Sequence, residues 1–76
     1  MEKEKFIQFF AAQFENTDVS NFSAETKFRE LEEWSSFLAL SIMAMADEEY
    51  NVKLKGEDIR VSQSINDLYE IVKSRI

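Results

Sequence analysis

Residues 35–51, SSFLALSIMAMADEEYN, form the stretch that decides the fold of this chain. Two serines open it, an apolar run follows, and an acidic run closes it. Most of its residues are strong helix formers, so we predict a helix that begins at Ser35 or Ser36 and ends at Tyr50. Asn51 comes next, and asparagine is second only to glycine in adopting the left-handed conformation that terminates helices.

The two serines admit two interpretations. A serine just before the first helical turn accepts a hydrogen bond from a backbone N–H and stabilises the helix by about 1 kcal/mol. Only one of Ser35 and Ser36 can hold that position, and the other is then the first helical residue. A phosphate ester on that second hydroxyl would lie where free N–H groups and the helix dipole favour an anion. From the residues alone, a plain cap and an attachment point both stay open.

The rest of the chain also favours helices, because it has no proline and only one glycine. We predict a first helix from about Glu2 to Phe14, a long polar connection that reaches Trp34, and a short helical turn at residues 56–60. Ser64 should cap a last helix, with Asp67 completing the capping box. The predicted core residues are Phe6, Ile7, Phe10, Phe14, Phe22, Phe28, Leu31, Trp34, Ile65, Leu68, Val72 and Ile76.

These elements predict an all-α fold with a single domain, residues 1–76. We expect a small antiparallel bundle of three main helices plus one short helix, with a long first loop. Ordinary loops are shorter than this one, so its length indicates a functional loop or further helical turns.

Composition excludes several classes of function. The formal net charge of −6 argues against a nucleic-acid surface, and the absence of histidine and cysteine removes the commonest general base, the commonest metal ligand and the thiolates. We therefore expect no enzyme activity, no metal site and no nucleic-acid partner. The longest apolar run is far shorter than the roughly 20 residues that span a bilayer, so we expect no membrane insertion and a cytoplasmic location. An acidic chain suits partners that present Lys and Arg.

The chain resembles the acyl carrier protein family over nearly its whole length. The resemblance lies in residues 28–37, FRELEEWSSF, in the helix after them that ends with DEEY at residues 47–50, and in the capped segment SINDL at residues 64–68. The family usually has Asp-Ser-Leu at the head of the second helix, where this chain has Ser35-Ser36-Phe37. The family's serine receives a 4'-phosphopantetheine arm, whose thiol carries acyl groups as thioesters.

The resemblance implies a function in fatty acid, lipid or polyketide biosynthesis. Ser36 would carry the 4'-phosphopantetheine, attached by a phosphopantetheinyl transferase. Acyl-transferring or acyl-modifying enzymes with basic docking patches would then bind the acidic helices of a monomeric carrier. The residues that the resemblance assigns to partner binding are Ser35, Phe37, Asp47, Glu48, Glu49, Glu57 and Asp58.

Departures from the family pattern occur at the start of the second helix. Ser35 replaces an aspartate that both caps the helix and helps hold the metal during attachment of the arm; a serine caps equally well but supplies no carboxylate. Leu38 and Ser41 stand where acidic residues are common, and we expect Leu38 to be exposed and to give partners a more hydrophobic contact. The alternative function is a carrier-like protein-interaction module that is never modified.

Overall fold

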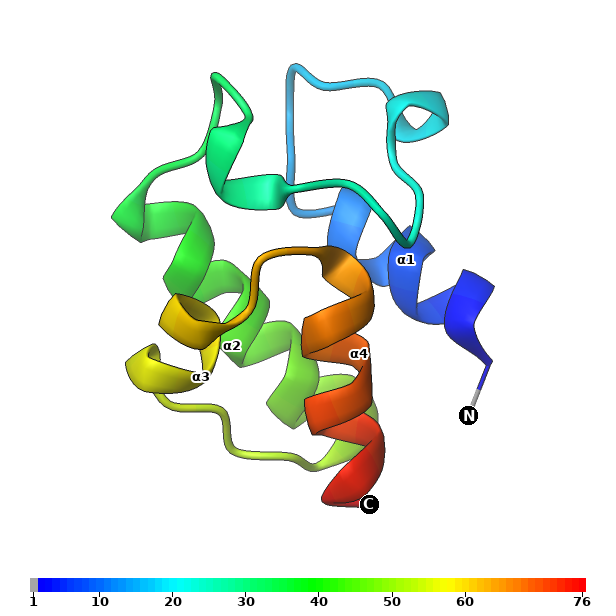
Figure 1. Cartoon of the computed structure of the whole chain (residues 1–76), viewed down its shortest axis with the longest axis vertical. Coiled ribbons are helices and arrows are strands. Elements are labelled where there is room, and N and C mark those ends of the chain that lie inside the picture. Colours follow the sequence, from blue (N-terminus) through cyan, green and yellow to red (C-terminus); the bar gives the residue numbers. More distant parts are fainter. Residues whose placement is uncertain (1) are drawn as a thin grey trace.

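The computed structural model describes residues 2–76, and all regular secondary structure within them is helical. In Figure 1, α1 runs in the opposite direction to α2 and α4, which confirms the predicted antiparallel bundle of three main helices plus one short helix, α3. The elements in chain order are α1 (Lys3–Ala11), the 3-10 turns η1 (Val19–Asn21) and η2 (Phe28–Glu30), α2 (Ser36–Tyr50), α3 (Gly56–Val61) and α4 (Ile65–Ser74).

The first helix is shorter than predicted, because α1 ends at Ala11 and not at Phe14. The N–H of Gln13 donates to the carbonyl of Phe10 (3.2 Å), and the N–H of Phe14 donates to that of Ala11 (3.0 Å). These bonds span three residues, so the chain leaves the helix through tighter turns. The turns stack the ring of Phe14 on that of Phe10, with 5.8 Å between centroids, and Phe14 stays in the core as predicted.

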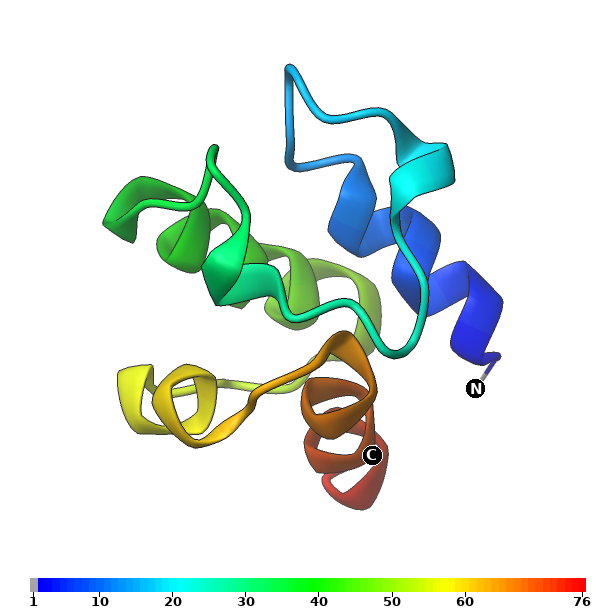
Figure 2. The same cartoon turned by 45° about the horizontal axis from the view of Figure 1, so that its top comes forward.

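The connection from α1 to α2, residues 12–35, is called the first connection below. It contains η1 and η2, so the predicted further helical turns are confirmed. Phe22 and Phe28 are buried and Trp34 is partly buried, which confirms that aromatic rings pin this segment to the core. The N–H of Ile65 donates to the carbonyl of Thr26 (3.0 Å), so the first connection also holds the start of α4, beside which it passes in Figure 2.

The longest helix, α2, begins and ends as predicted. It starts at Ser36, and Asn51 follows it in the left-handed conformation, with φ 57° and ψ 37°. No helix in the described part of the chain, α2 included, combines the length and the apolar character needed to cross a membrane. The residues of α2 that are buried in the core are Leu38, Ile42, Met45 and Ala46.

The capping box of α4 is confirmed. The Ser64 hydroxyl accepts a hydrogen bond from the N–H of Asp67 (3.2 Å), and the Asp67 carboxylate accepts one from the N–H of Ser64 (3.1 Å). Ile65, Leu68 and Val72 are buried, as predicted. The prediction for Ile76 is wrong, since this side chain is 69% exposed. The helix ends at Ser74, before the apolar spacing reaches Ile76.

Candidate functional site at the start of α2

The two serines divide into a capping residue and a free residue. Ser35 has extended backbone angles, its hydroxyl accepts the N–H of Leu38 (3.3 Å), and its carbonyl accepts the N–H of Ala39 (3.1 Å). It is therefore the N-cap, which shows which of the two serines caps α2. Ser36 is the first helical residue, and its side chain is exposed.

The surroundings of Ser36 suit an anion. The N–H groups of Ser36 and Phe37 have no acceptor among residues 2–76, and the first turn of α2 contains no acidic side chain. Unpaired N–H groups at a helix N-terminus carry partial positive charge that the helix dipole reinforces. A phosphate ester on the Ser36 hydroxyl would therefore be stabilised where it forms.

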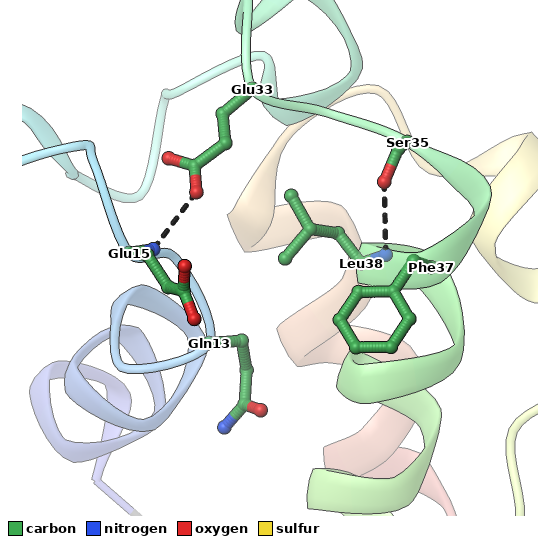
Figure 3. Close-up of a pocket in the computed structure, with 6 residues that line it drawn as sticks. All are labelled: Gln13, Glu15, Glu33, Ser35, Phe37 and Leu38. Atoms are coloured by element: carbon green, nitrogen blue, oxygen red, sulfur yellow. Dashed lines mark hydrogen bonds between the residues drawn. The ribbon is translucent and has the colours of Figure 1, made fainter.

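A hollow lies between the turn that follows α1 and the first turn of α2. In Figure 3, Phe37 and Leu38 form its α2 side, and Gln13 and Glu15 approach from the end of α1. The hollow thus has an apolar side and a polar side, and two of its lining residues, Ser35 and Phe37, are the chain neighbours of Ser36. Its lining residues are Gln13, Glu15, Glu33, Ser35, Phe37 and Leu38.

Glu33 joins the two sides of this hollow. Its carboxylate accepts hydrogen bonds from the N–H of Glu15 (2.9 Å), the N–H of Asn16 (3.1 Å) and the hydroxyl of Thr17 (2.8 Å). Partial burial raises the pKa of Glu33, but the Thr17 hydroxyl and the backbone donors outweigh that effect and lower its pKa below the ordinary value. We call this set of contacts the Glu33 clamp.

The Glu33 clamp was not predicted from the sequence. Glu33 stands in a run of charged residues that predicts a solvated surface, and its partners lie 16–18 positions earlier in the chain. No helical or strand periodicity links residues at that separation inside an irregular segment. The sequence feature that could have indicated the clamp is the unusual length of the first connection, because so long a connection needs contacts that hold it in place.

The first half of α2 presents apolar side chains to solvent, but Leu38, which was predicted to be exposed, is not one of them. Leu38 is only 5% exposed, so the expectation that it faces partners is wrong. Helical spacing places it on the same side as Ile42, in the core. Phe37 and Leu40, three residues apart, are 74% and 62% exposed and take that place on the surface. Val61, at the end of α3, is also 64% exposed.

The acidic residues assigned to partners fall into two groups. Four of them are exposed on α2 and α3, and one of these, Asp47, forms an ion pair with Lys53 at 3.1 Å. Asp58 instead is buried, so its predicted place on the acidic surface is not supported by its position. The exposed carboxylates are those of Asp47, Glu48, Glu49 and Glu57.

Asp58 connects the first turn of α3 to Lys55 and to Arg75. Its carboxylate accepts two hydrogen bonds from the Arg75 guanidinium, both 2.8 Å, and one from the N–H of Lys55, also 2.8 Å. The hydroxyl of Ser62 donates to its backbone carbonyl (2.8 Å). The hydrogen bonds from Arg75 lower the pKa of Asp58 below its ordinary value despite its burial. The Asp58 carboxylate is thus bonded inside the protein.

Comparison with protein-family models and with curated proteins finds no match to this chain. Within residues 2–76, no group of three or more acidic side chains is arranged to hold a metal ion.

Proposed function

We propose that this protein is a carrier of the acyl carrier type, with Ser36 as the attachment point of a 4'-phosphopantetheine arm. The observation that carries the proposal is the division between the serines: Ser35 occupies the cap, which leaves the Ser36 hydroxyl exposed at the start of α2. The resemblance of residues 28–37 and 64–68 to the family supports the same assignment.

The residues around Ser36 fit a phosphodiester. The free N–H groups of Ser36 and Phe37 would face its charge, and the hollow of Figure 3 lies within reach of a flexible arm on the same helical turn. In the loading step, the Ser36 oxygen bonds to the arm's phosphorus in coenzyme A, and the pyrophosphate linkage breaks. The adenosine-bearing phosphate leaves, and the serine proton passes to a base of the transferase. When bound, the arm supplies a thiol that carries acyl groups as thioesters.

The partners would be cytoplasmic enzymes that bind to the exposed side chains of α2 and α3. Phe37 and Leu40 offer an apolar contact beside Ser36, and the exposed carboxylates at the far end of α2 suit lysines and arginines. Such a partner would have an apolar centre and a basic rim. The transferase and the acyl-transferring or acyl-modifying enzymes of lipid or polyketide biosynthesis fit this description. Asp58 is left out of the docking surface because Arg75 occupies it.

The test is loading of Ser36, measured as an increase in intact mass after co-expression with a broad-specificity phosphopantetheinyl transferase. We expect the wild-type protein and Ser35→Ala to gain one arm and Ser36→Ala to gain none. Ser35→Asp should be loaded faster than wild type, because it restores a carboxylate next to the attachment point. No mass gain in the wild type, or a gain that persists in Ser36→Ala, would refute the carrier function.

One observation favours a second function, a carrier-like interaction module that is never modified. The N-cap of α2 bears a hydroxyl, so it supplies no carboxylate to a metal at the attachment point. This alternative predicts an unmodified Ser36 with every transferase tested, and a stable protein complex in pull-down. That complex should be weakened by Phe37→Ala and unaffected by Ser36→Ala.

A further inference from the structure

We propose that Glu33 is a positioning residue for the loading of Ser36: its carboxylate fixes the segment that presents the Ser36 hydroxyl and holds the opposite side of the hollow in place. This inference rests on the proposed carrier function. Glu33 itself would touch neither the arm nor the reacting atoms.

Three consecutive residues before Ser36 are each held by a different contact. Glu33 binds residues 15–17 through three hydrogen bonds of 2.8–3.1 Å. Trp34 stacks on Phe14, with 6.2 Å between ring centroids, and Ser35 caps α2. Ser36 is thus the first residue after a rigidly held segment, and the Glu33 clamp is the polar part of that support.

The Glu33 clamp also forms the wall opposite α2. Residues 15–17 follow the turn after α1 and have exposed or partly exposed side chains, and the clamp ties them to the start of α2. Its loss would free this turn, widen the hollow and loosen the backbone that leads into Ser36. Phosphoryl transfer requires the attacking oxygen in line with the breaking bond, so small displacements lower the rate steeply.

A direct electrostatic role for Glu33 in docking is the competing explanation. Its two carboxylate oxygens already accept hydrogen bonds from three groups of the protein, and the residue is partly buried. The neighbouring Glu32 is exposed and forms no hydrogen bond or ion pair within residues 2–76. A partner's cation would therefore meet Glu32 first, which makes Glu32 a matched control of the same charge.

The experiment measures kcat and KM for loading of the full chain by a phosphopantetheinyl transferase with coenzyme A, for wild type, Glu33→Gln, Glu32→Gln and Thr17→Val. We expect kcat to fall about tenfold in Glu33→Gln with KM little changed, since the substitution disturbs orientation and not docking. Thr17→Val removes one donor from the other side of the clamp and should lower kcat by a smaller factor. Glu32→Gln should leave kcat unchanged.

Amide hydrogen exchange supplies a readout that does not depend on loading. The amides of Glu15 and Asn16 should be protected in wild type and in Glu32→Gln and should lose protection in Glu33→Gln. If Glu33→Gln or Thr17→Val stays folded and its amides lose protection, but its kcat is unchanged, the positioning role is overturned. That result leaves the proposed carrier function intact. Equal effects of Glu32→Gln and Glu33→Gln, confined to KM, also overturn the positioning role in favour of charge-based docking. A wild-type protein that no transferase loads refutes the carrier function, and the role of Glu33 with it.

Discussion

Both long connections of this protein bury apolar side chains in the core, but the first adds aromatic pairs and the second adds an ion pair. The first connection, residues 12–35, packs aromatic rings into the core: Phe28 lies 5.3 Å from Phe10 and 5.0 Å from Trp34 between ring centroids, and both pairs meet edge-on. The second connection, residues 51–64, contains α3; it buries Val52, Leu54 and Ile59 in the core and adds the bidentate ion pair of Asp58 with Arg75.

Because of this difference, the two connections should respond differently to pH. Burial of aromatic surface is nearly independent of pH and of salt, so the packing under the start of α2 should persist wherever the protein is folded. The ion pair depends on an ionised Asp58 and on Arg75, the second-last residue described. The position of α3 should therefore respond to pH and to the replacement of Arg75, while the aromatic part of the support of Ser36 should not. The Glu33 clamp, which also needs an ionised carboxylate, should weaken at low pH.

The largest effect is expected from Phe28→Ala, which attacks the first connection. Phe28 is completely buried between two aromatic rings, so its truncation should lower the free energy of unfolding by roughly 3–5 kcal/mol. Urea denaturation followed by circular dichroism measures this loss. The matched control is Phe37→Ala, at a ring that is 74% exposed, and its effect should stay within about 0.5 kcal/mol. Similar losses in both variants would contradict the aromatic account of the first connection.

Asp58→Asn tests the second connection and should have an intermediate effect. The amide keeps the size of the side chain but gives up the charge-assisted bonds to Arg75, whose side chain is 41% exposed and so partly screened. We expect a loss of about 1–2 kcal/mol at neutral pH, together with faster hydrogen exchange in α3 but not in the first connection. Glu57→Gln, one residue away and exposed, is the control and should change neither measurement.

The same ion pair predicts a pH dependence with a definite sign. Hydrogen bonds from Arg75 hold the pKa of folded Asp58 below its ordinary value of 3.8, so the ion pair stabilises the folded state fully above that value. Its contribution is lost as the pH falls through the lower folded-state pKa, because the unfolded state binds the proton first. Acid titration of wild type should show α3 loosening in this range. The step should be absent in Asp58→Asn, whose stability should change less with pH below about 5.

Much of the fold could be predicted because it depends on local chemistry. The bounds of α2, the left-handed Asn51 and the Ser64–Asp67 capping box follow from helix propensity and capping, which act over four residues or fewer. The errors lie at the ends of helices, which propensity and spacing do not fix. Ile76 has the right spacing for burial but lies beyond the end of α4, and Phe14 reaches the core from a turn and not from the helix.

At the candidate site, only the features that depend on residues near one another in the chain were predicted. The roles of Ser35 as cap and Ser36 as the free hydroxyl follow from the rules for a helix start, once the register of α2 is known. The burial of Leu38 follows from that register too, because helical spacing places Leu38 on the same side of α2 as the buried Ile42. Glu33 and Asp58 were missed because their partners, Thr17 and Arg75, lie far along the chain.

The smallest effect is expected from Lys53→Ala. This substitution tests whether an exposed ion pair helps to hold the second connection. Lys53 pairs with Asp47 at 3.1 Å, yet their side chains are 81% and 46% exposed, whereas that of Asp58 is 12% exposed. Water and salt screen an exposed pair, so Lys53→Ala should change the free energy of unfolding by less than about 0.5 kcal/mol. Urea denaturation at low and at high salt, with Asp58→Asn as the comparison, measures the contrast. A loss in Lys53→Ala as large as that in Asp58→Asn would mean that burial does not decide which ion pair holds α3.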